Sequence, residues 1–272
     1  MTRYRTTIRR FRLADQIGLT LTVVLFCLGA WASGARAIEP PSRVVSLGSS
    51  VTEIIYALGE QGRLVARDST STFPPAVLEM PDVGYLRALS PESVISMRPD
   101  LILSEEGAGP IEAIELLRST QIPFAEVPED YSTQGIVDKI RSVGAALGTP
   151  EKAHQLAAEI ETELRMVAAE VASETRPRKR VMFVLSTQDG RIMASGVGTS
   201  ADAMIAMAGG DNALASFDGY KPVTPEAIAG ARPDVILMMD RMGDHATSNA
   251  DLFAMPAFRT TPAAQHNAVI RM

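Results

Sequence analysis

Few side chains in this chain of 272 residues are of the types that commonly do chemistry. It has three histidines and one cysteine, and it contains no HExxH, CxxC, GxSxG or Walker sequence. Three scattered histidines do not make a metal centre. The remaining candidates are tyrosines, arginines and glutamates that recur in two similar stretches, which favours ligand binding over catalysis.

The two stretches share one order of residues. Residues 83–104 read VGYLRALSPESVISMRPDLILS, and residues 219–239 read GYKPVTPEAIAGARPDVILMM. Each contains Gly-Tyr, then a Ser/Thr-Pro-Glu triplet, an Arg-Pro-Asp triplet and an apolar run. Two lobes of one architecture explain such a repeat.

Each copy predicts a helix followed by a strand. Ser90 and Thr224 are good N-cap residues, and each precedes a proline that suits the first helical position. Glu92 and Glu226 then fall in the first turn, where a carboxylate meets the positive end of the helix dipole. The Arg-Pro-Asp triplet ends the helix because the residue before proline is pushed out of the α region. The apolar runs are predicted to be strands of a parallel sheet that is buried on both faces.

The segments around these two copies also carry helix-capping signals, and a long helix is predicted between the copies. Ser50 with Glu53 has the spacing of a capping box, and Ser200 is predicted to cap a helix after the GVGT loop. Residues 150–174 carry an apolar stripe without glycine or internal proline, so at ~1.5 Å per residue they predict a helix about 35 Å long. Its position between the repeats favours a strut over an ordinary surface helix of the second lobe.

The predicted fold is α/β: two Rossmann-like lobes joined by a single long helix, with the ligand cleft between the lobes. Further strands are predicted at residues 43–47, 63–66, 123–127, 181–185, 191–194 and 268–272, and further helices at 50–58, 110–119, 136–147 and 200–208.

The first 37 residues predict an export signal, and hence a periplasmic protein. Five arginines precede an apolar stretch at residues 17–30, and Ala35-Arg36-Ala37 is a small-x-small cleavage sequence. Arg9-Arg10 is faintly similar to a twin-arginine signal, although any basic leader gives this pattern. The remaining chain divides into an N-terminal lobe at 38–149, the linking helix at 150–175 and a C-terminal lobe at 176–272. A parallel strand at 268–272 is normally followed by a helix that covers the sheet, so we expect the sequence to be truncated by a few tens of residues.

Charge and hydropathy exclude two classes of protein. The chain has 26 Lys+Arg against 32 Asp+Glu, and cleavage after Ala37 removes six arginines and one aspartate, leaving a net charge of −11. Such a surface does not suit nucleic acid. No later segment approaches 18 uninterrupted apolar residues, so no membrane span is predicted.

Taken together, these features resemble a known family. The export signal, RVVSLGSSVTEIIYALG, DVGYLRALSPESVISMRPDLILS, the central helix and GYKPVTPEAIAGARPDVILMMDR are similar to the periplasmic haem-binding proteins of bacterial haem ABC importers, within the cobalamin- and siderophore-type binding proteins. The resemblance implies a monomer that carries haem b to an inner-membrane permease and its ATPase. Binding of cobalamin or a ferric siderophore, and a haem-dependent enzyme, are the alternatives. Bare divalent metal is disfavoured because His and Cys are scarce.

The stretch Gly84-Tyr85-Leu86-Arg87 is what points to haem within that class. Ferric haem takes a hard anionic axial ligand, and a tyrosine phenolate is one solution. The resemblance implies that Tyr85 binds the iron and that Arg87 hydrogen-bonds the phenolate, which a nearby cation stabilises. Tyr220 is expected to face the cleft as pocket wall or second ligand, and His245 is either a second ligand or an exposed loop residue. Weaker candidates for lining the pocket are Ser49, Thr199, Arg241 and Met242.

The same resemblance assigns a partner to two glutamates. Glu92 and Glu226 are expected to contact arginines on the two halves of the permease. Alternatively, they only complement the dipoles of their helices, which is worth ~0.3–1 kcal/mol each.

Overall fold

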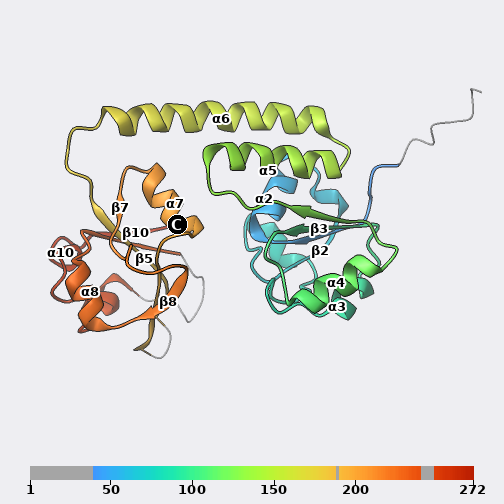
Figure 1. Ribbon diagram of the computed structural model, residues 1–272. Helices are drawn as coiled ribbons and strands as arrows, with labels where there is room; N and C mark the ends of the chain where they lie inside the picture. The colour runs from blue at the N-terminus through green and yellow to red at the C-terminus, as the bar shows by residue number, and fades with distance from the viewer. Residues whose placement is uncertain (1–38, 188–189, 240–247) are drawn as a thin grey trace, which may run out of the picture. The chain divides into compact units, whose positions relative to one another are not determined.

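The computed structural model describes residues 39–187, 190–239 and 248–272. It confirms two α/β lobes connected by one long helix, α6 (Pro150–Ser173) (Figure 1). The predicted export signal lies outside the described residues. The domain boundaries and the cleft between the lobes stay predictions.

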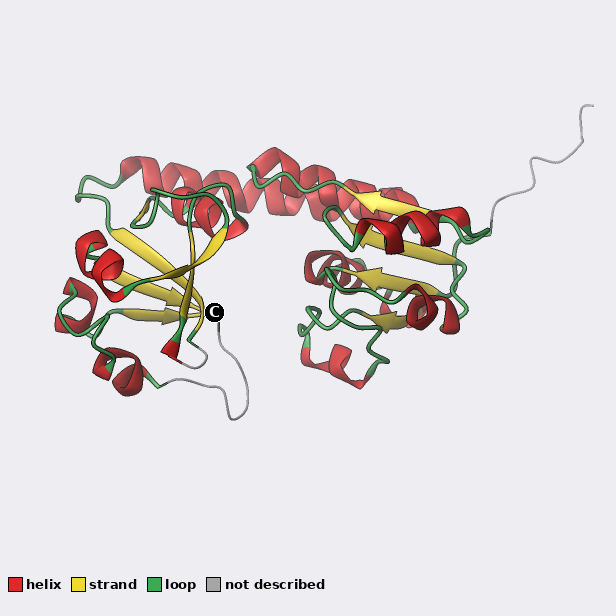
Figure 2. Cartoon of the chain, turned by 60° about the horizontal axis from the view of Figure 1, so that its bottom comes forward, coloured by secondary structure: helices red, strands yellow, loops and turns green. Residues whose placement is uncertain are grey.

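The N-terminal lobe is built on four parallel strands in the order β2-β1-β3-β4. Figure 2 shows the four strands pointing the same way, with helices on both faces. Apolar residues alternate between two cores, since Val44 and Leu103 face α2, α5 and α6, whereas Val45 and Ile102 face α3 and α4. The sheet is therefore covered on both sides, as its continuous apolar strands predicted. Its elements are β1 (Val44–Leu47), α2 (Ser49–Ala57), η1 (Gln61–Arg63), β2 (Leu64–Arg67), η2 (Pro75–Glu79), α3 (Pro91–Ser96), β3 (Leu101–Glu105), α4 (Ile111–Ser119), β4 (Phe124–Val127) and α5 (Thr133–Ala146).

The C-terminal lobe has a mixed sheet in the order β10-β9-β5-β6-β8, with β7 paired to β5. Strand β6 runs antiparallel to both β5 and β8. Tyr220, the counterpart of Tyr85 in the repeat, is the first residue of β8, a strand that the sequence did not predict, and it pairs with Ser195. The elements are β5 (Arg180–Ser186), β6 (Ile192–Ser195), α7 (Ser200–Met207), β7 (Asp211–Asn212), β8 (Tyr220–Val223), α8 (Pro225–Ala231), β9 (Val235–Met238), α9 (Asn249–Ala254), α10 (Pro262–Gln265) and β10 (Val269–Arg271).

The predicted helix starts in the two copies are confirmed. The Ser90 hydroxyl caps α3 and the Thr224 hydroxyl caps α8, each accepting a hydrogen bond from the backbone N–H three residues on. In both helices a proline occupies the first turn. The Ser/Thr-Pro-Glu triplets thus encode the same local structure in both lobes.

The Arg-Pro-Asp triplets end the helices as predicted, since the residue before each proline leaves the right-handed α region. Arg98 and Arg232 adopt the left-handed conformation, with φ of 49° and 48°, rather than extended backbone. Asp100 then accepts a hydrogen bond from the Arg43 N–H, and Asp234 accepts one from the Arg180 N–H. Each aspartate therefore ties the end of its helix to the start of the first strand of its own lobe.

Two expected caps are wrong. Ser50 does not cap α2, because the helix begins one residue earlier and its N-cap is Gly48, with φ 112°. A Cβ at Gly48 would lie 2.3 Å from an oxygen of Glu105, so only glycine fits there. Helix α7 is capped by Thr199 rather than Ser200, through a 3.0 Å bond from the Asp202 N–H.

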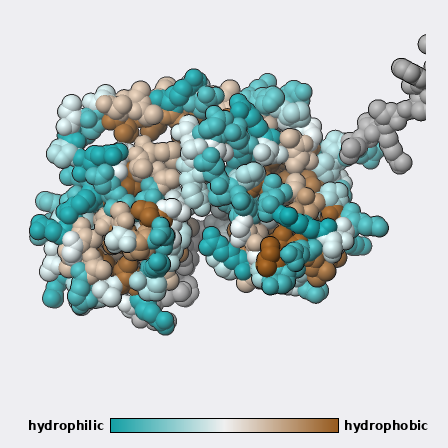
Figure 3. Space-filling view, in the orientation of Figure 1, coloured by the Kyte–Doolittle hydropathy of each residue, from teal (hydrophilic) through white to brown (hydrophobic). Residues whose placement is uncertain are grey.

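Helix α6 contacts both lobes. Ala153 and Ala157 are buried in the N-terminal core, where α6 lies beside α5 (Figure 1). Near its other end, Val171 approaches Gly209 so closely that an added Cβ would meet it at 2.7 Å. Between these contacts, Met166 and Val167 are exposed, and Figure 3 shows apolar residues among the polar ones along this half of the helix. Among the described residues, no helix has both the length and the apolar composition of a membrane span.

Candidate ligand-binding site

The loop that carries Tyr85 is fixed to its neighbours on both sides. The Ser69 N–H, in the loop after β2, donates to the Gly84 carbonyl at 2.9 Å, and the Gly109 N–H, in the loop after β3, donates to the Leu86 carbonyl at 2.9 Å. These bonds hold the loop at the carboxyl edge of the N-terminal sheet. Open α/β sheets bind their ligands at this edge.

Tyr85 itself is presented to solvent. Its side chain is 49% exposed, and its hydroxyl makes no hydrogen bond with any residue in the described part of the chain. The preceding Gly84 has φ 106° and donates to the Asp82 carboxylate at 2.8 Å. Asp82 pairs in turn with Arg67 at 2.7 Å. The backbone is thus anchored, whereas the phenol is exposed. A side chain that binds a metal ion, or that donates a hydrogen bond to a carboxylate, requires this arrangement.

Arg87 is also exposed and makes no ion pair or hydrogen bond with a described residue. The predicted bond between Arg87 and the Tyr85 oxygen is not among the bonds of the described chain, so it stays a prediction. The guanidinium also acts on another phenol at this edge, since burial and Glu129 raise the pKa of Tyr131 and the positive charge of Arg87 opposes this rise. Within the described ranges, no carboxylate pairs with this charge.

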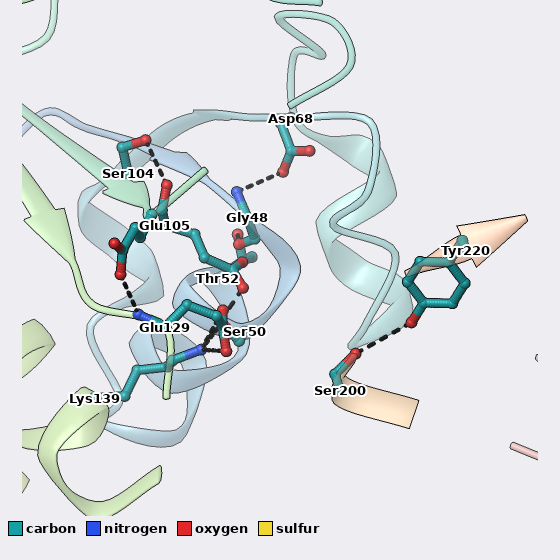
Figure 4. A network of polar contacts seen from close by, with 11 residues as sticks. Gly48, Ser50, Thr52, Asp68, Ser104, Glu105, Glu129, Lys139, Ser200 and Tyr220 are labelled. Carbon is teal, nitrogen blue, oxygen red and sulfur yellow. Dashed lines mark hydrogen bonds and ion pairs between the residues drawn. The ribbon is translucent and has the colours of Figure 1, made fainter. Parts of the chain in front are cut away.

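A buried cluster of charge lies beneath the same edge (Figure 4). The Lys139 ammonium on α5 donates to both oxygens of Glu129 at 2.8 Å and to the Ser50 hydroxyl at 3.2 Å, and it lies 3.6 Å from Glu105. Ser50 lies in the first turn of α2, Glu105 ends β3, Glu129 lies in the loop after β4, and Lys139 lies on α5, so the cluster forms where the strands end. Through Lys139, the cluster connects the first turn of α2 to the β4–α5 loop.

The cluster holds one proton between two carboxyl groups. Burial and a hydrogen bond with Glu129 together raise the pKa of Glu105 to about 7, against the attraction of Lys139. Burial acts to raise the pKa of Glu129 as well, but hydrogen bonds from Glu105 and Lys139 lower it. Glu129 is therefore the anion that faces the lysine, and Glu105 keeps its proton up to about pH 7.

A second polar network fixes the neighbouring loop. Asp68 is buried and accepts hydrogen bonds from the Gly48 N–H at 2.9 Å and the Ser71 hydroxyl at 2.8 Å. The Thr52 hydroxyl lies 2.7 Å from those of Ser46 and Ser71. Each of these groups is satisfied by another, so this network positions the backbone rather than offering groups to a ligand.

The second copy of the Gly-Tyr pair is more enclosed. Tyr220 is half-buried, packs edge-on against Phe183 with ring centroids 6.3 Å apart, and lies 3.4 Å from the Ser200 hydroxyl (Figure 4). Thr199 is buried, and its hydroxyl is engaged by the Asp202 N–H and by Ser195. Ser49, the first residue of α2, is half-buried. The other three predicted pocket residues, Arg241, Met242 and His245, lie outside the described residues.

The two glutamates of the repeat occupy matching positions. Glu92 and Glu226 are exposed on the first turns of α3 and α8. The Ser90 hydroxyl lowers the pKa of Glu92, and the backbone N–H of Glu226 together with the Thr224 hydroxyl lowers that of Glu226. Both carboxylates are therefore charged at neutral pH. Ile95, one turn after Glu92, places an exposed apolar side chain beside the first of them.

Sequence reasoning missed Tyr131 and the cluster of Glu105, Glu129 and Lys139. One signal was present, because Lys139 stands three residues after Ile136 and four before Val143, and so lies beside the apolar stripe of its helix. A lysine at such a position needs a partner when it is buried. Its partners come from β3 and from the loop after β4, and helical spacing cannot reveal them.

The chain belongs to the periplasmic binding protein family, whose model matches residues 44–272. Among solved structures, the periplasmic heme-binding protein RhuT from Roseiflexus sp. RS-1 is 35% identical, with a TM-score of 0.78 over 85% of this chain and 88% of that one. An uncharacterized ABC transporter substrate-binding lipoprotein of Bacillus subtilis is 29% identical over 215 residues, 78% of this chain and 68% of the relative. The vitamin B12-binding protein of Salmonella typhimurium is 25% identical over 233 residues, 85% of this chain and 83% of the relative. The predicted class of protein is thereby confirmed.

Proposed function

We propose that this protein captures ferric haem in the periplasm and delivers it to an inner-membrane ABC permease. The observation that carries the proposal is the Tyr85 loop, whose backbone is anchored on both sides and whose exposed phenol has no hydrogen-bond partner among the described residues. A tyrosinate is a hard oxygen ligand suited to ferric iron, and Arg87 supplies a nearby positive charge for the phenolate or for a propionate. The similarity to RhuT supports haem as the ligand.

Tyr85 is the axial ligand in this proposal, and Arg87 stabilises its anion. Tyr220 forms part of the pocket wall, since its ring is already packed on Phe183 and its hydroxyl is near Ser200. Thr199 has no role in binding the ligand, because its hydroxyl is buried and engaged in capping. Ser49, Arg241, Met242 and His245 remain candidates for contacts with the porphyrin edge. The protein acts as a monomer.

Glu92 and Glu226 dock the loaded protein on the permease. Both are exposed carboxylates at equivalent first turns of the two lobes, and both are held charged by hydrogen bonds. Arginines of the membrane partner are the expected counter-charges, because a guanidinium pairs with a carboxylate through two parallel bonds. Docking at two matching points suits a permease made of two similar halves.

Titration of the exported form with hemin tests the proposal directly. We expect one-to-one binding with the charge-transfer band of high-spin ferric haem bound by tyrosinate. Cobalamin is the second candidate, because of the similarity to the vitamin B12-binding protein, and cyanocobalamin is titrated in parallel. Binding of cyanocobalamin without binding of hemin would replace the proposed ligand and leave the family unchanged.

A further inference from the structure

Hydrogen bonds hold Glu129, Asp130 and Ser132 in the segment between β4 and α5. The Glu129 carboxylate is held by Lys139, and its N–H donates to Glu106 at 2.9 Å. Asp130 accepts from the Ser132 N–H at 2.9 Å, and the Ser132 hydroxyl caps α5. Residues 129–132, here called the Tyr131 segment, are thus held in place by hydrogen bonds of both backbone and side chains.

Tyr131 is the exception within this segment. Its side chain is 37% exposed, and its hydroxyl makes no hydrogen bond with any residue in the described ranges. The segment follows β4, which is parallel to β3, so it lies at the same carboxyl edge of the sheet as the Tyr85 loop. A partly covered phenol that has no partner in the part of the chain that the structure describes, on an anchored segment at this edge, has the features that make Tyr85 a ligand-binding candidate.

The charges around the two tyrosines suggest different roles. Burial raises the pKa of Tyr131, the carboxylate of Glu129 raises it further, and Tyr220 and Glu105 add to the effect, whereas Arg87 opposes it. The Tyr131 phenol therefore keeps its proton at neutral pH and is a hydrogen-bond donor. Beside carboxylates it is unsuited to bind iron as a phenolate, but it can donate to an acceptor on the ligand.

We propose that Tyr131 is a second tyrosine of the haem site and that its hydroxyl donates a hydrogen bond to a carboxylate of the porphyrin. The inference rests on the proposed function and adds a contact that selects for ligand carboxylates. A phenol suits this role because it offers one O–H donor on a stiff ring with few rotatable bonds. The carboxylate that accepts this bond also lies within the field of Arg87, which offsets the repulsion from Glu129.

The test compares Tyr131→Phe with the unchanged protein, using ferric haem and its dimethyl ester, in which both carboxylates are blocked. We expect Tyr131→Phe to weaken binding of haem about tenfold, the loss of one hydrogen bond to a charged group, and to leave binding of the ester unchanged. The tyrosinate charge-transfer band of bound ferric haem should persist in the variant. Tyr56→Phe, on the partly buried Tyr56 of α2, is the matched control and should bind both ligands normally.

Each other outcome overturns the inference. Unchanged affinity for haem in Tyr131→Phe means that the hydroxyl makes no contact with the ligand. Equal weakening for haem and ester means that only packing was lost, and disappearance of the charge-transfer band means that Tyr131 binds iron. Failure of the unchanged protein to bind haem overturns the proposed function and this inference together, so the two failures are distinguishable.

Discussion

The two copies of the Gly-Tyr stretch agree in their helices and differ at their tyrosines. In both, a hydroxyl caps the helix, an arginine takes the left-handed conformation and an aspartate ties the helix to the first strand. Tyr85, however, stands exposed on an anchored loop, whereas Tyr220 begins a strand and packs on Phe183. The repeat therefore preserves the framework, and the sheet that each copy joins decides what its tyrosine can do.

Replacing each tyrosine by phenylalanine gives the sharpest test of that difference. Tyr85→Phe should weaken hemin binding by roughly a hundredfold and remove the tyrosinate charge-transfer band, because the axial oxygen is lost. Tyr220→Phe should change the affinity less than about threefold, since its ring packing is retained. Absorption titration with hemin measures both. An unchanged ferric spectrum in Tyr85→Phe would move the ligand to another residue.

The two glutamates should behave alike where the tyrosines do not. Replacing both Glu92 and Glu226 by alanine should leave hemin binding intact and reduce import to background, because both contacts with the permease are lost. Each single variant should retain partial import. Growth on hemin as the iron source, with its cognate permease, measures the effect, and Glu112→Ala, on the first turn of α4, is the matched control. Normal growth with the double variant would show that the carboxylates only complement their helices.

Alanine substitutions at three glycines with positive φ distinguish the cost of a steric clash from the cost of backbone strain. Gly48→Ala should destabilise the protein by ~3 kcal/mol, because its Cβ would meet Glu105 and its φ is 112°. Gly84→Ala should cost about 1–2 kcal/mol, since φ is 106° but nothing lies within 4 Å. Gly219→Ala, with φ 76° near the left-handed helical region and open space, should cost about 1 kcal/mol. Urea unfolding gives all three values, and a cost for Gly48→Ala equal to that for Gly84→Ala would show that Glu105 moves aside.

Replacing Arg87 should change the pH at which the iron–tyrosinate bond is lost more than it changes the affinity for hemin. Without the guanidinium, the Tyr85 phenolate is protonated more readily, so in Arg87→Ala the pH at which half of the charge-transfer band is lost should rise by about one unit. Spectra of the hemin complex recorded between pH 4 and 9 check this shift. An unchanged midpoint would mean that Arg87 meets the ligand elsewhere, for example at a propionate.

The cluster beneath the N-terminal edge should give that lobe a pH dependence. Because the native pKa of Glu105 is raised to about 7, the folded protein binds its proton more tightly than the unfolded chain does, and the free energy of unfolding falls as pH rises from 4.5 to 7. Glu129 acts with the opposite sign, since its pKa is lowered and its contribution is lost below pH 4.5. Glu105→Gln should remove the decline and be more stable than the unchanged protein at pH 8, by on the order of 1 kcal/mol after solvent screening.

Urea unfolding at pH 5, 6, 7 and 8 measures this effect. Glu106→Gln, on the neighbouring residue, serves as the control and should keep the decline. Parallel profiles for Glu105→Gln and the unchanged protein would mean that the proton is not held by this pair. In the described residues of the C-terminal lobe no carboxyl group has a raised pKa, so the effect belongs to the N-terminal half.

The sequence by itself determined the two lobes, the long helix between them and both helix starts. These follow from local chemistry, since a hydroxyl before proline starts a helix and an apolar β-branched run forms a buried strand wherever it lies. Only the tertiary structure decided that Tyr220 joins a strand, that Gly48 caps α2 and that Tyr131 lies at the same edge as Tyr85. Each of these depends on partners far along the chain, such as Ser195 for Tyr220 and Glu105 for Gly48. A spacing pattern within one segment contains no information about which loops a sheet brings together.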